Sequence, residues 1–421
     1  MKIVQVNQQD IGGGGFIAAF RLHRAFRDIG HESRLVVISK LTDDPDVIPL
    51  VRPNFLAKAL WRALDNANSS MVRRYRGKPC YGWVAHDVPT WAPYVINRLT
   101  PDAINLNFFN CMLSARQVAS LKAPCFWSFH DMHPFTGGCH YTRICDRYLD
   151  KCGSCPELAS DDTEDISNRG HTQRKQIWNS GIVGVTQSVW LTELARSSTL
   201  CQNRRIERIP MGVPLDIFHP SRRHAARHKF RFQDEKFYVL AGASSNANAL
   251  KGIGFVEEAA DLLAAQFSDR LVFVTFGSHP SKIQNVEVLH LGYLKTDAEL
   301  ADIYSACDLY VLPTLLDNLP QMLMESIACG TPAITFDIGG CPDIIADGVN
   351  GTVVREHSVD AVATSIERFA TMPQDQIVAF RDRSRSVAAE KFDILDCARK
   401  YIELFSEKTP VIVYDNSRTR T

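Results

Sequence analysis

The sequence predicts an α/β protein built from two Rossmann-like domains. Three observations lead to this prediction. The chain has 421 residues, which is longer than a single compact core usually is. Short β-branched segments alternate with amphipathic helical ones, as they do in parallel sheets with helical crossovers. This alternation starts afresh near residue 215, after the segment IPMGVP at 209–214, whose prolines and glycine suit a hinge.

The first half follows the alternation from its first residues. A β-branched run is followed by four glycines, and the amphipathic pattern at Phe16–Ile29 predicts a helix that ends before Gly30. Strands are expected at Lys2–Asn7, Ser33–Ile38, Ala103–Phe108, Cys125–Phe129 and Ile182–Thr186. These elements make residues 1–208 an N-terminal Rossmann-like domain.

The second half repeats the pattern over residues 215–393, which are expected to form a second Rossmann-like domain. Its strands are predicted at Lys236–Ala243, Leu271–Phe276, Leu309–Pro313 and Ala333–Phe336. Its helices are predicted at Ile253–Gln266, Glu299–Cys307 and Pro320–Cys329. A last helix, at 394–410, is expected to pack back on the N-terminal domain.

Composition narrows the class of protein. Lysine plus arginine equals aspartate plus glutamate at 47 each, so no global positive charge points to nucleic acid as a partner. The N-terminal apolar run is too short for a signal peptide, and no segment reaches the roughly 18 apolar residues of a membrane span. We therefore expect a cytoplasmic protein whose twelve cysteines are mostly reduced.

The most informative segment runs LPTLLDNLPQMLMESIACGTP from Leu312 to Pro332. It reads as strand, loop, helix, tight turn and strand, with Asn318 as helix N-cap and Pro320 in the first turn. Asp317 and Glu325 lie eight residues apart, about 12 Å along a helix, so they suit two ends of one elongated ligand better than one acid–base dyad. The alternative is purely structural: a cap at Asp317 and a solvated carboxylate at Glu325.

This segment resembles the acidic signature of the retaining glycosyltransferases of family 4, which have the GT-B fold of two Rossmann-like domains facing across a cleft. The signature is two acids with seven residues between them, followed by an ACGTP turn. Here Asp317 stands where the family usually has glutamate, while Glu325 matches. The DNLP form is similar to that of bacterial exopolysaccharide, colanic acid and O-antigen transferases.

The resemblance implies a nucleotide-sugar donor, with UDP or GDP as the nucleotide, and no catalytic metal. It also implies that residues 1–208 form the acceptor-side domain and residues 215–393 the nucleotide-sugar-binding domain. Lys251 is expected to neutralise the diphosphate, although the usual nearby arginine is absent and Ser244, Ser245 or Asn246 stands in its place. By itself, Lys251 would read as a solvated surface lysine. The positions implied for binding the donor in this half are Ser245, Gly277, Tyr293, Leu294, Asn318, Leu319, Pro320 and Glu325.

Two features of the first half match the same picture. The run Gly12–Gly15 lets the backbone approach a phosphate or sugar closely, and Gly13 and Gly14 are implied to contact the donor. A flexible turn without a ligand is the alternative. His130 ends a predicted strand, where a histidine is more often structural. The resemblance places it beside the transferred sugar, as a catalytic residue with Lys251, Asp317 and Glu325.

Four cysteines follow His130, and they leave three interpretations open. Their C-x-x-C spacing at 152–155, with two cysteines upstream, is typical of a closed structural zinc site. Unbound reduced thiols and disulfides are the alternatives. The candidate ligands are Cys139, Cys145, Cys152 and Cys155.

The segment Arg52–Lys78 is strongly basic. It carries seven lysines and arginines against the single acid Asp65, a net charge of +6, together with Trp61 and several leucines. It resembles an interfacial amphipathic segment that binds an anionic membrane surface. A solvated basic helix packed on the first domain is the alternative.

Taken together, the sequence predicts a retaining hexosyltransferase that acts on a glycan acceptor, lipid-linked in our interpretation, in bacterial surface polysaccharide synthesis. It would be cytoplasmic, with peripheral contact to the inner face of the plasma membrane. Two alternatives remain: a GT-B-like sugar-nucleotide epimerase, and a non-catalytic sugar-nucleotide-binding partner of a polysaccharide assembly complex.

Overall fold

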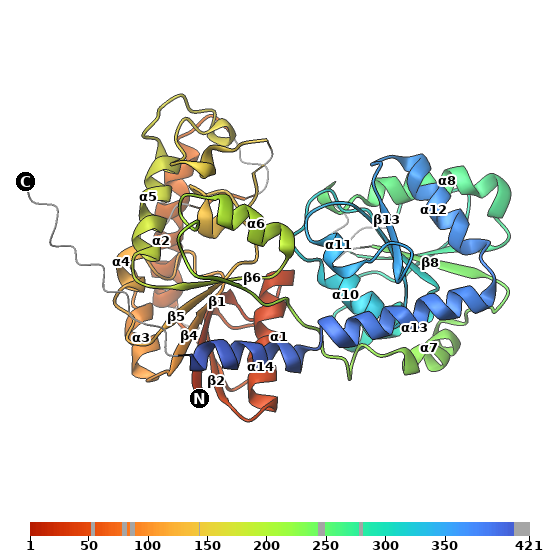
Figure 1. Ribbon diagram of the computed structural model, residues 1–421, viewed down its shortest axis with the longest axis horizontal. Coiled ribbons are helices and arrows are strands. Elements are labelled where there is room, and N and C mark those ends of the chain that lie inside the picture. The colour runs from red at the N-terminus through yellow and green to blue at the C-terminus, as the bar shows by residue number, and fades with distance from the viewer. Residues whose placement is uncertain are drawn as a thin grey trace, which may run out of the picture. The chain divides into compact units, whose positions relative to one another are not determined.

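The computed structural model describes residues 1–51, 55–77, 82–84, 89–142, 144–242, 249–277 and 281–407. The chain divides into two compact units. Unit 1 comprises Met1–Ile209 together with the chain from Cys397, and unit 2 comprises Pro210–Asp396. Each unit is an α/β fold around one parallel sheet, as predicted (Figure 1).

The sheet of unit 1 has the strand order β3-β2-β1-β4-β5-β6-β7, and all of its neighbouring strands are parallel. Its strands are β1 (Lys2–Gln9), β2 (Glu32–Ser39), β3 (Val47–Pro49), β4 (Ala103–Leu106), β5 (Cys125–Ser128), β6 (Val183–Thr186) and β7 (Ile206–Arg208). Its helices are α1 (Gly14–Asp28), α2 (Phe55–Arg73), α3 (Ala92–Arg98), α4 (Ala115–Val118), α5 (Ile166–Trp178) and α6 (Val189–Ser197).

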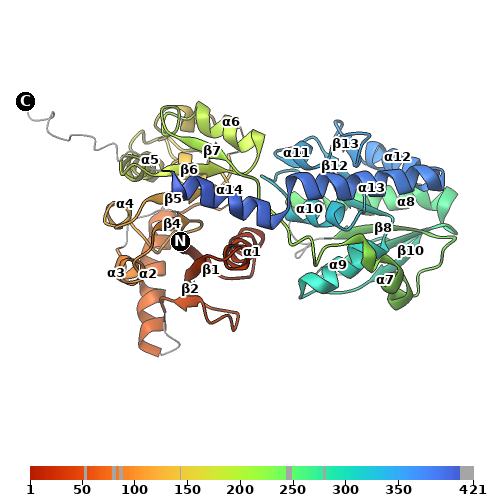
Figure 2. The same ribbon diagram turned by 60° about the horizontal axis from the view of Figure 1, so that its bottom comes forward.

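Helices cover both faces of this sheet, which explains why its central strands are buried on both sides (Figure 2). On one face, Val4, Ile104 and Trp127 belong to the same core cluster as residues of α3 and α4. On the other, α14 (Ile394–Ser406) packs its aromatic residues: Phe405 lies 4.5 Å from Phe126, centroid to centroid, and the Tyr401 hydroxyl contacts Ser128 Oγ at 2.9 Å. The last helix therefore completes the core of unit 1.

The sheet of unit 2 has the order β10-β9-β8-β11-β12-β13 and is also parallel. Its strands are β8 (Phe237–Gly242), β9 (Leu271–Phe276), β10 (Glu287–His290), β11 (Leu309–Leu312), β12 (Ala333–Phe336) and β13 (Gly351–Val354). Its helices are α7 (Arg223–Phe230), α8 (Ile253–Phe267), α9 (Asp297–Ala306), α10 (Gln321–Ala328), α11 (Cys341–Ile344), α12 (Val359–Ala370) and α13 (Gln374–Lys391).

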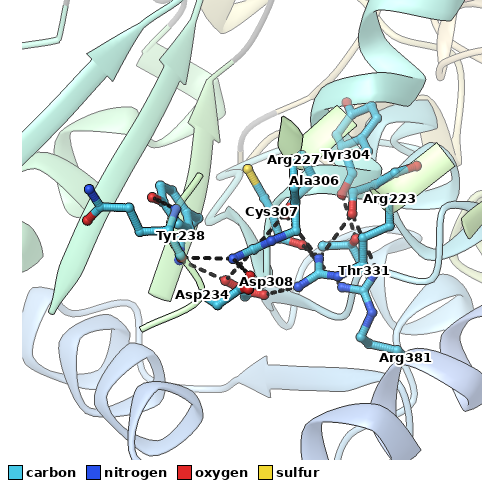
Figure 3. Close-up of polar contacts among 12 residues, drawn as sticks. Arg223, Arg227, Asp234, Tyr238, Tyr304, Ala306, Cys307, Asp308, Thr331 and Arg381 are labelled. Atoms are coloured by element: carbon cyan, nitrogen blue, oxygen red, sulfur yellow. Dashed lines mark hydrogen bonds and ion pairs between the residues drawn. The ribbon is translucent and has the colours of Figure 1, made fainter. Parts of the chain in front are cut away.

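An arginine cluster fixes the amino end of β11 in unit 2 (Figure 3). Arg223 Nη1 donates to the carbonyls of Ser305, Ala306 and Cys307, at the end of α9, over 2.9–3.1 Å. Arg381 from α13 donates to the Cys307 carbonyl at 3.2 Å. These bonds satisfy the carbonyls that a helix end leaves without partners, and they tie α7, α9 and α13 together.

Each sheet reverses its strand order at one point, between β1 and β4 in unit 1 and between β8 and β11 in unit 2. In open parallel sheets, ligands bind beyond the carboxyl ends of the strands at such a point. No helix in the described part of the chain is long and apolar enough to cross a membrane.

Candidate functional site

Unit 2 brings Lys251 and Asp317 together at its reversal point. Lys251 ends the short helix η5 (Ala249–Lys251) after β8, and Asp317 lies in the loop after β11. Lys251 Nζ donates a hydrogen bond to Asp317 Oδ2 at 2.6 Å, an ion pair between residues 66 positions apart. Burial lowers the pKa of Lys251, but the Asp317 carboxylate outweighs burial, so the net pKa is raised. Lys251 is therefore a stable cation.

The helix after Asp317 begins later than the sequence predicted. Asn318 was expected to be its N-cap, but α10 spans Gln321–Ala328 and its N-cap is Pro320. The Pro320 carbonyl accepts the first bonds of the helix, from Leu323 N at 3.1 Å and Met324 N at 3.4 Å. Proline brings no side-chain acceptor, so nothing from Pro320 covers the first amides of α10.

Glu325 lies in the middle of α10 and is 4% exposed, so it is not the solvated carboxylate of the structural alternative. Two buried tyrosines lie in its electrostatic surroundings, Tyr304 and Tyr310. Burial raises the pKa of both well above 10, and the negative charge of Glu325 raises them further. The Tyr310 hydroxyl donates to the Gly242 carbonyl at 3.1 Å and so holds the end of β8.

Of the other predicted donor-binding positions of unit 2, some lie close together and others do not. Gly277 N bonds Gly292 O at 2.9 Å, so the turns after β9 and β10 lie side by side. Tyr293 is 57% exposed, while Leu294 packs against the core. Leu319, next to Pro320, is buried. Ser245 lies outside the described residues.

In unit 1 the glycine run forms the turn from β1 into α1. Gly13 is the N-cap of α1 and Gly14 its first residue. Gly12 has a φ of 118°, which favours glycine. The turn is held by Asp10, whose carboxylate accepts hydrogen bonds from Leu41 N at 2.9 Å and Thr42 N at 2.8 Å. The run is thus an anchored turn, not a loose one.

One aromatic ring, that of Phe108, lies between this turn and His130. A Cβ at Gly15 would lie 2.3 Å from the ring of Phe108, so only glycine fits there. The Phe108 ring stacks on His130 with centroids 4.8 Å apart, and Phe16 packs against its edge at 5.4 Å. The reversal point of unit 1 therefore gathers the glycine turn after β1, Phe108 after β4 and His130 after β5.

His130 is a neutral, hydrogen-bonded imidazole. Its Nε2 contacts Asn107 Oδ1 at 2.9 Å and its Nδ1 contacts Gln187 Nε2 at 3.2 Å. The amide oxygen only accepts and the amide nitrogen only donates, so the proton lies on Nε2. Burial lowers the pKa of His130 to about 4. The predicted role of His130 in stabilising charge and orienting the sugar would therefore be played by a neutral imidazole, and it stays a prediction.

Sequence reasoning missed the polar network that continues from His130. Asp131 is buried and contacts His140 Nδ1 through Oδ2 at 2.5 Å. His140 stacks on His133 with centroids 5.1 Å apart, and Arg174 Nε donates to the His133 carbonyl at 2.7 Å. The only signal in the sequence was the density of polar residues directly after a buried strand.

The four cysteines of the zinc interpretation lie close enough to interact, since the other three affect the pKa of Cys139. All four are free thiols, which argues against the disulfide interpretation. Over the residues that the structure describes, no group of three or more histidine, cysteine, aspartate or glutamate side chains is placed to hold a metal ion. A hydrogen bond between the Cys139 and Cys155 thiols lowers the pKa of Cys155 to about 7, and burial raises that of Cys152 to about 12. The structure does not test the zinc interpretation, which stays a prediction beside that of unbound reduced thiols.

Part of unit 2, including its candidate site, is similar to a known protein family. Residues 236–372, which include Lys251, Asp317 and Glu325, match the family model "Glycosyl transferases group 1". The D-inositol 3-phosphate glycosyltransferase of Streptosporangium roseum is 31% identical over 186 residues, 40% of this chain and 42% of that protein. Its counterpart from Mycolicibacterium smegmatis is 29% identical over 176 residues, 38% and 39% of the two chains. The chain thus spans about two fifths of the length of these curated relatives.

Solved structures extend the likeness to both units. Sucrose-phosphate synthase from Thermosynechococcus elongatus aligns with 96% of this chain and 98% of its own, at a TM-score of 0.68 and 16% identity. WaaG, a glycosyltransferase involved in lipopolysaccharide biosynthesis, aligns over 96% and 100% with a TM-score of 0.64 and 14% identity. Anabaena Alr3699/HepE in complex with UDP and glucose aligns over 97% and 100% with a TM-score of 0.61 and 14% identity. The chain therefore has the GT-B fold.

Proposed function

We propose that this chain is a retaining glycosyltransferase that moves a hexose from a nucleotide-sugar donor to a glycan acceptor. The observation that carries the proposal is the pairing of Lys251 with Asp317 at the reversal point of unit 2, eight residues before the buried Glu325. All three residues lie within the region that matches the glycosyltransferase family.

The donor is assigned to unit 2. Lys251 and the N-terminus of α10 bind its diphosphate, because a cation and a helix N-terminus both favour an anion. Glu325 binds the ribose hydroxyls, and the turns at Gly277 and Gly292 bracket the base. The HepE structures with UDP and with UDP-glucose share this fold, which supports a nucleotide sugar as donor.

The proposed sugar transfer balances in charge and protons without a protein nucleophile. The bond from the anomeric carbon to the diphosphate oxygen breaks, and its electron pair stays on the diphosphate. The acceptor hydroxyl forms the new bond on the same face, and its proton passes to the departing phosphate oxygen. Lys251 neutralises the charge that develops on the diphosphate, an electrostatic contribution to lowering the barrier.

Unit 1 is assigned to the acceptor and to orienting the transferred sugar. Its glycine turn offers backbone amides, and neutral His130 offers a fixed imidazole held by two amide side chains. WaaG shares the fold and is involved in lipopolysaccharide biosynthesis, which supports an acceptor that is a lipid-linked glycan in surface polysaccharide synthesis.

Donor binding and turnover test this function directly. Purified protein is screened by thermal shift against UDP- and GDP-sugars, and the best donor is then incubated with glycan acceptors. We expect one donor to raise the melting temperature, and NMR of the product to show the donor's anomeric configuration. Binding without transfer or hydrolysis would favour a non-catalytic partner, and epimerised donor would favour an epimerase.

A further inference from the structure

The pair formed by Lys251 and Asp317 is held from three sides by the backbone of unit 2. Leu315 N donates to the Leu250 carbonyl at 2.7 Å, and Thr314 Oγ1 donates to the same carbonyl at 2.8 Å. These bonds tie the turn that carries Lys251 to the loop that carries Asp317. Backbone contacts on both sides of the pair therefore set the position of the two side chains relative to each other.

Two glycines allow the remaining contacts. A Cβ at Gly252, directly after Lys251, would lie 1.9 Å from the Pro313 carbonyl oxygen. A Cβ at Gly339 would lie 1.9 Å from the Asp317 carbonyl oxygen, which also accepts a bond from Gly340 N at 3.3 Å. Both glycines have positive φ, at 68° and 56°. The turns after β8, β11 and β12 thus meet around one ion pair, closely enough that no side chain fits between them.

The pair is largely shielded from solvent, so its attraction is not lost to screening. The side chains of Lys251 and Asp317 are 24% and 16% exposed. At 2.6 Å, Asp317 Oδ2 is already occupied by the ammonium group. A carboxylate held in this way interacts first with the lysine. The two-acid pattern of the sequence had instead placed Asp317 at one end of an elongated ligand.

We propose that Asp317 is a positioning residue that holds the Lys251 ammonium group for the donor diphosphate. This inference rests on the proposed function, since it needs a diphosphate in the site of unit 2. It assigns Asp317 to the nucleotide diphosphate through Lys251 rather than to the hydroxyls of the transferred sugar. The two assignments differ in one measurable respect, the affinity for a nucleotide that carries no sugar.

The experiment is calorimetric titration of the full chain with UDP, GDP, UDP-glucose and GDP-mannose. The Asp317→Asn variant keeps the side-chain shape but removes the charge that orients Lys251. We expect it to bind the preferred nucleoside diphosphate at least about tenfold more weakly, the scale of one charged hydrogen bond. The sugar-carrying form should lose affinity by the same factor. Asp317→Glu should restore most of it, because the carboxylate still reaches Lys251.

A double variant distinguishes the positioning of Lys251 by Asp317 from an unspecific loss of structure. If Asp317 acts through Lys251, adding Asp317→Asn to Lys251→Ala should cost no further affinity. Asp302→Asn is the matched control, because Asp302 is 17% exposed and pairs with Arg222 at 2.6 Å in the same unit. It should leave nucleotide affinity unchanged. Melting temperatures show which variants are folded, and Asp317→Glu remains informative where Asp317→Asn is not.

Three results decide the inference. Equal losses for the nucleotide with and without sugar, with no added loss in the double variant, support it. A loss confined to the sugar-carrying form, with normal binding of UDP or GDP, overturns it and returns Asp317 to the sugar while leaving the proposed function intact. Absence of nucleotide binding by the wild-type protein overturns the proposed function, and this inference with it.

Discussion

Glu325 is the acidic residue whose role depends most clearly on burial. It is 4% exposed and lies among buried tyrosines, where a carboxylate is costly unless it serves a ligand or a hydrogen bond. We predict that Glu325→Gln lowers kcat/KM for the donor about 10- to 100-fold, because it removes one charged hydrogen bond to the ribose. Steady-state kinetics with the preferred donor measure this loss. Glu390→Gln, at an exposed position in the same unit, should be neutral.

The burial of His130 leads to a prediction about how the free energy of unfolding depends on pH. Its pKa is lowered from 6.5 to about 4 by burial, so the unfolded chain binds this proton more readily than the folded one between those two values. The His130 contribution to the free energy of unfolding is therefore fully present above pH 6.5. It is lost as the pH falls toward 4, by up to about 3 kcal/mol.

The measurement is urea unfolding of wild type and His130→Gln between pH 4 and 8. The difference in the free energy of unfolding between the two should shrink on acidification. A histidine NMR signal that is lost in the variant should show no titration above pH 5 in the wild type. Titration of that signal near pH 6.5 would contradict a buried, neutral His130.

At the scale of elements, strands and helices followed from the sequence more readily than contacts did. The segment 312–332 was correctly read as strand, loop, helix and strand, because a buried β-branched run and an amphipathic run are local signals. The cap was misassigned, because Asn318 and Pro320 both suit a helix start and tertiary contacts decide between them. The Lys251–Asp317 pair could not be predicted, since it joins two loops 66 residues apart in sequence.

Helix α5 closely approaches the backbone of the loop that contains Gly137, and a single substitution can test this contact. A Cβ at Gly170 would lie 2.0 Å from the Gly137 carbonyl oxygen and 2.9 Å from Nη1 of buried Arg174. We predict that Gly170→Ala lowers the free energy of unfolding by about 1–3 kcal/mol, as overpacking does. Urea denaturation checks this. Exposed Arg169→Ala on the same helix should change it by less than about 0.5 kcal/mol.

At the scale of the whole chain, the repeated α/β pattern was enough to predict two Rossmann-like units. Each unit buries parallel strands that read as apolar runs, and this signal is independent of the partner unit. The expectation that the last helix packs back on the N-terminal domain needs more than this pattern. The amphipathic spacing of α14 shows that one face is buried, but only the contacts of Tyr401 and Phe405 show that this face completes unit 1.

The distribution of charge over the molecule leads to a prediction about membranes. The chain is neutral overall, yet α2 and the turn after it expose Lys58, Arg62, Arg73, Arg74 and Arg76. Trp61 of α2 packs against Trp91, with ring centroids 5.9 Å apart, and belongs to the edge of the unit 1 core. Because this tryptophan is used in packing, we expect α2 to bind anionic lipid by charge and not by inserting Trp61.

Vesicle co-sedimentation tests this electrostatic mode of binding. Each well-placed basic residue contributes roughly 1 kcal/mol at an anionic surface, and the attraction is screened beyond a Debye length of about 8 Å at physiological salt. Binding should therefore rise with the anionic lipid fraction, fall with added salt and weaken when Arg73, Arg74 and Arg76 are changed together to glutamine. The matched control changes Arg98, Arg116 and Lys122, which are exposed on or near α3 and α4, and it should bind as wild type. Equal sedimentation with neutral and anionic vesicles, or none with either, would contradict this electrostatic binding and leave the basic segment as an ordinary solvated face.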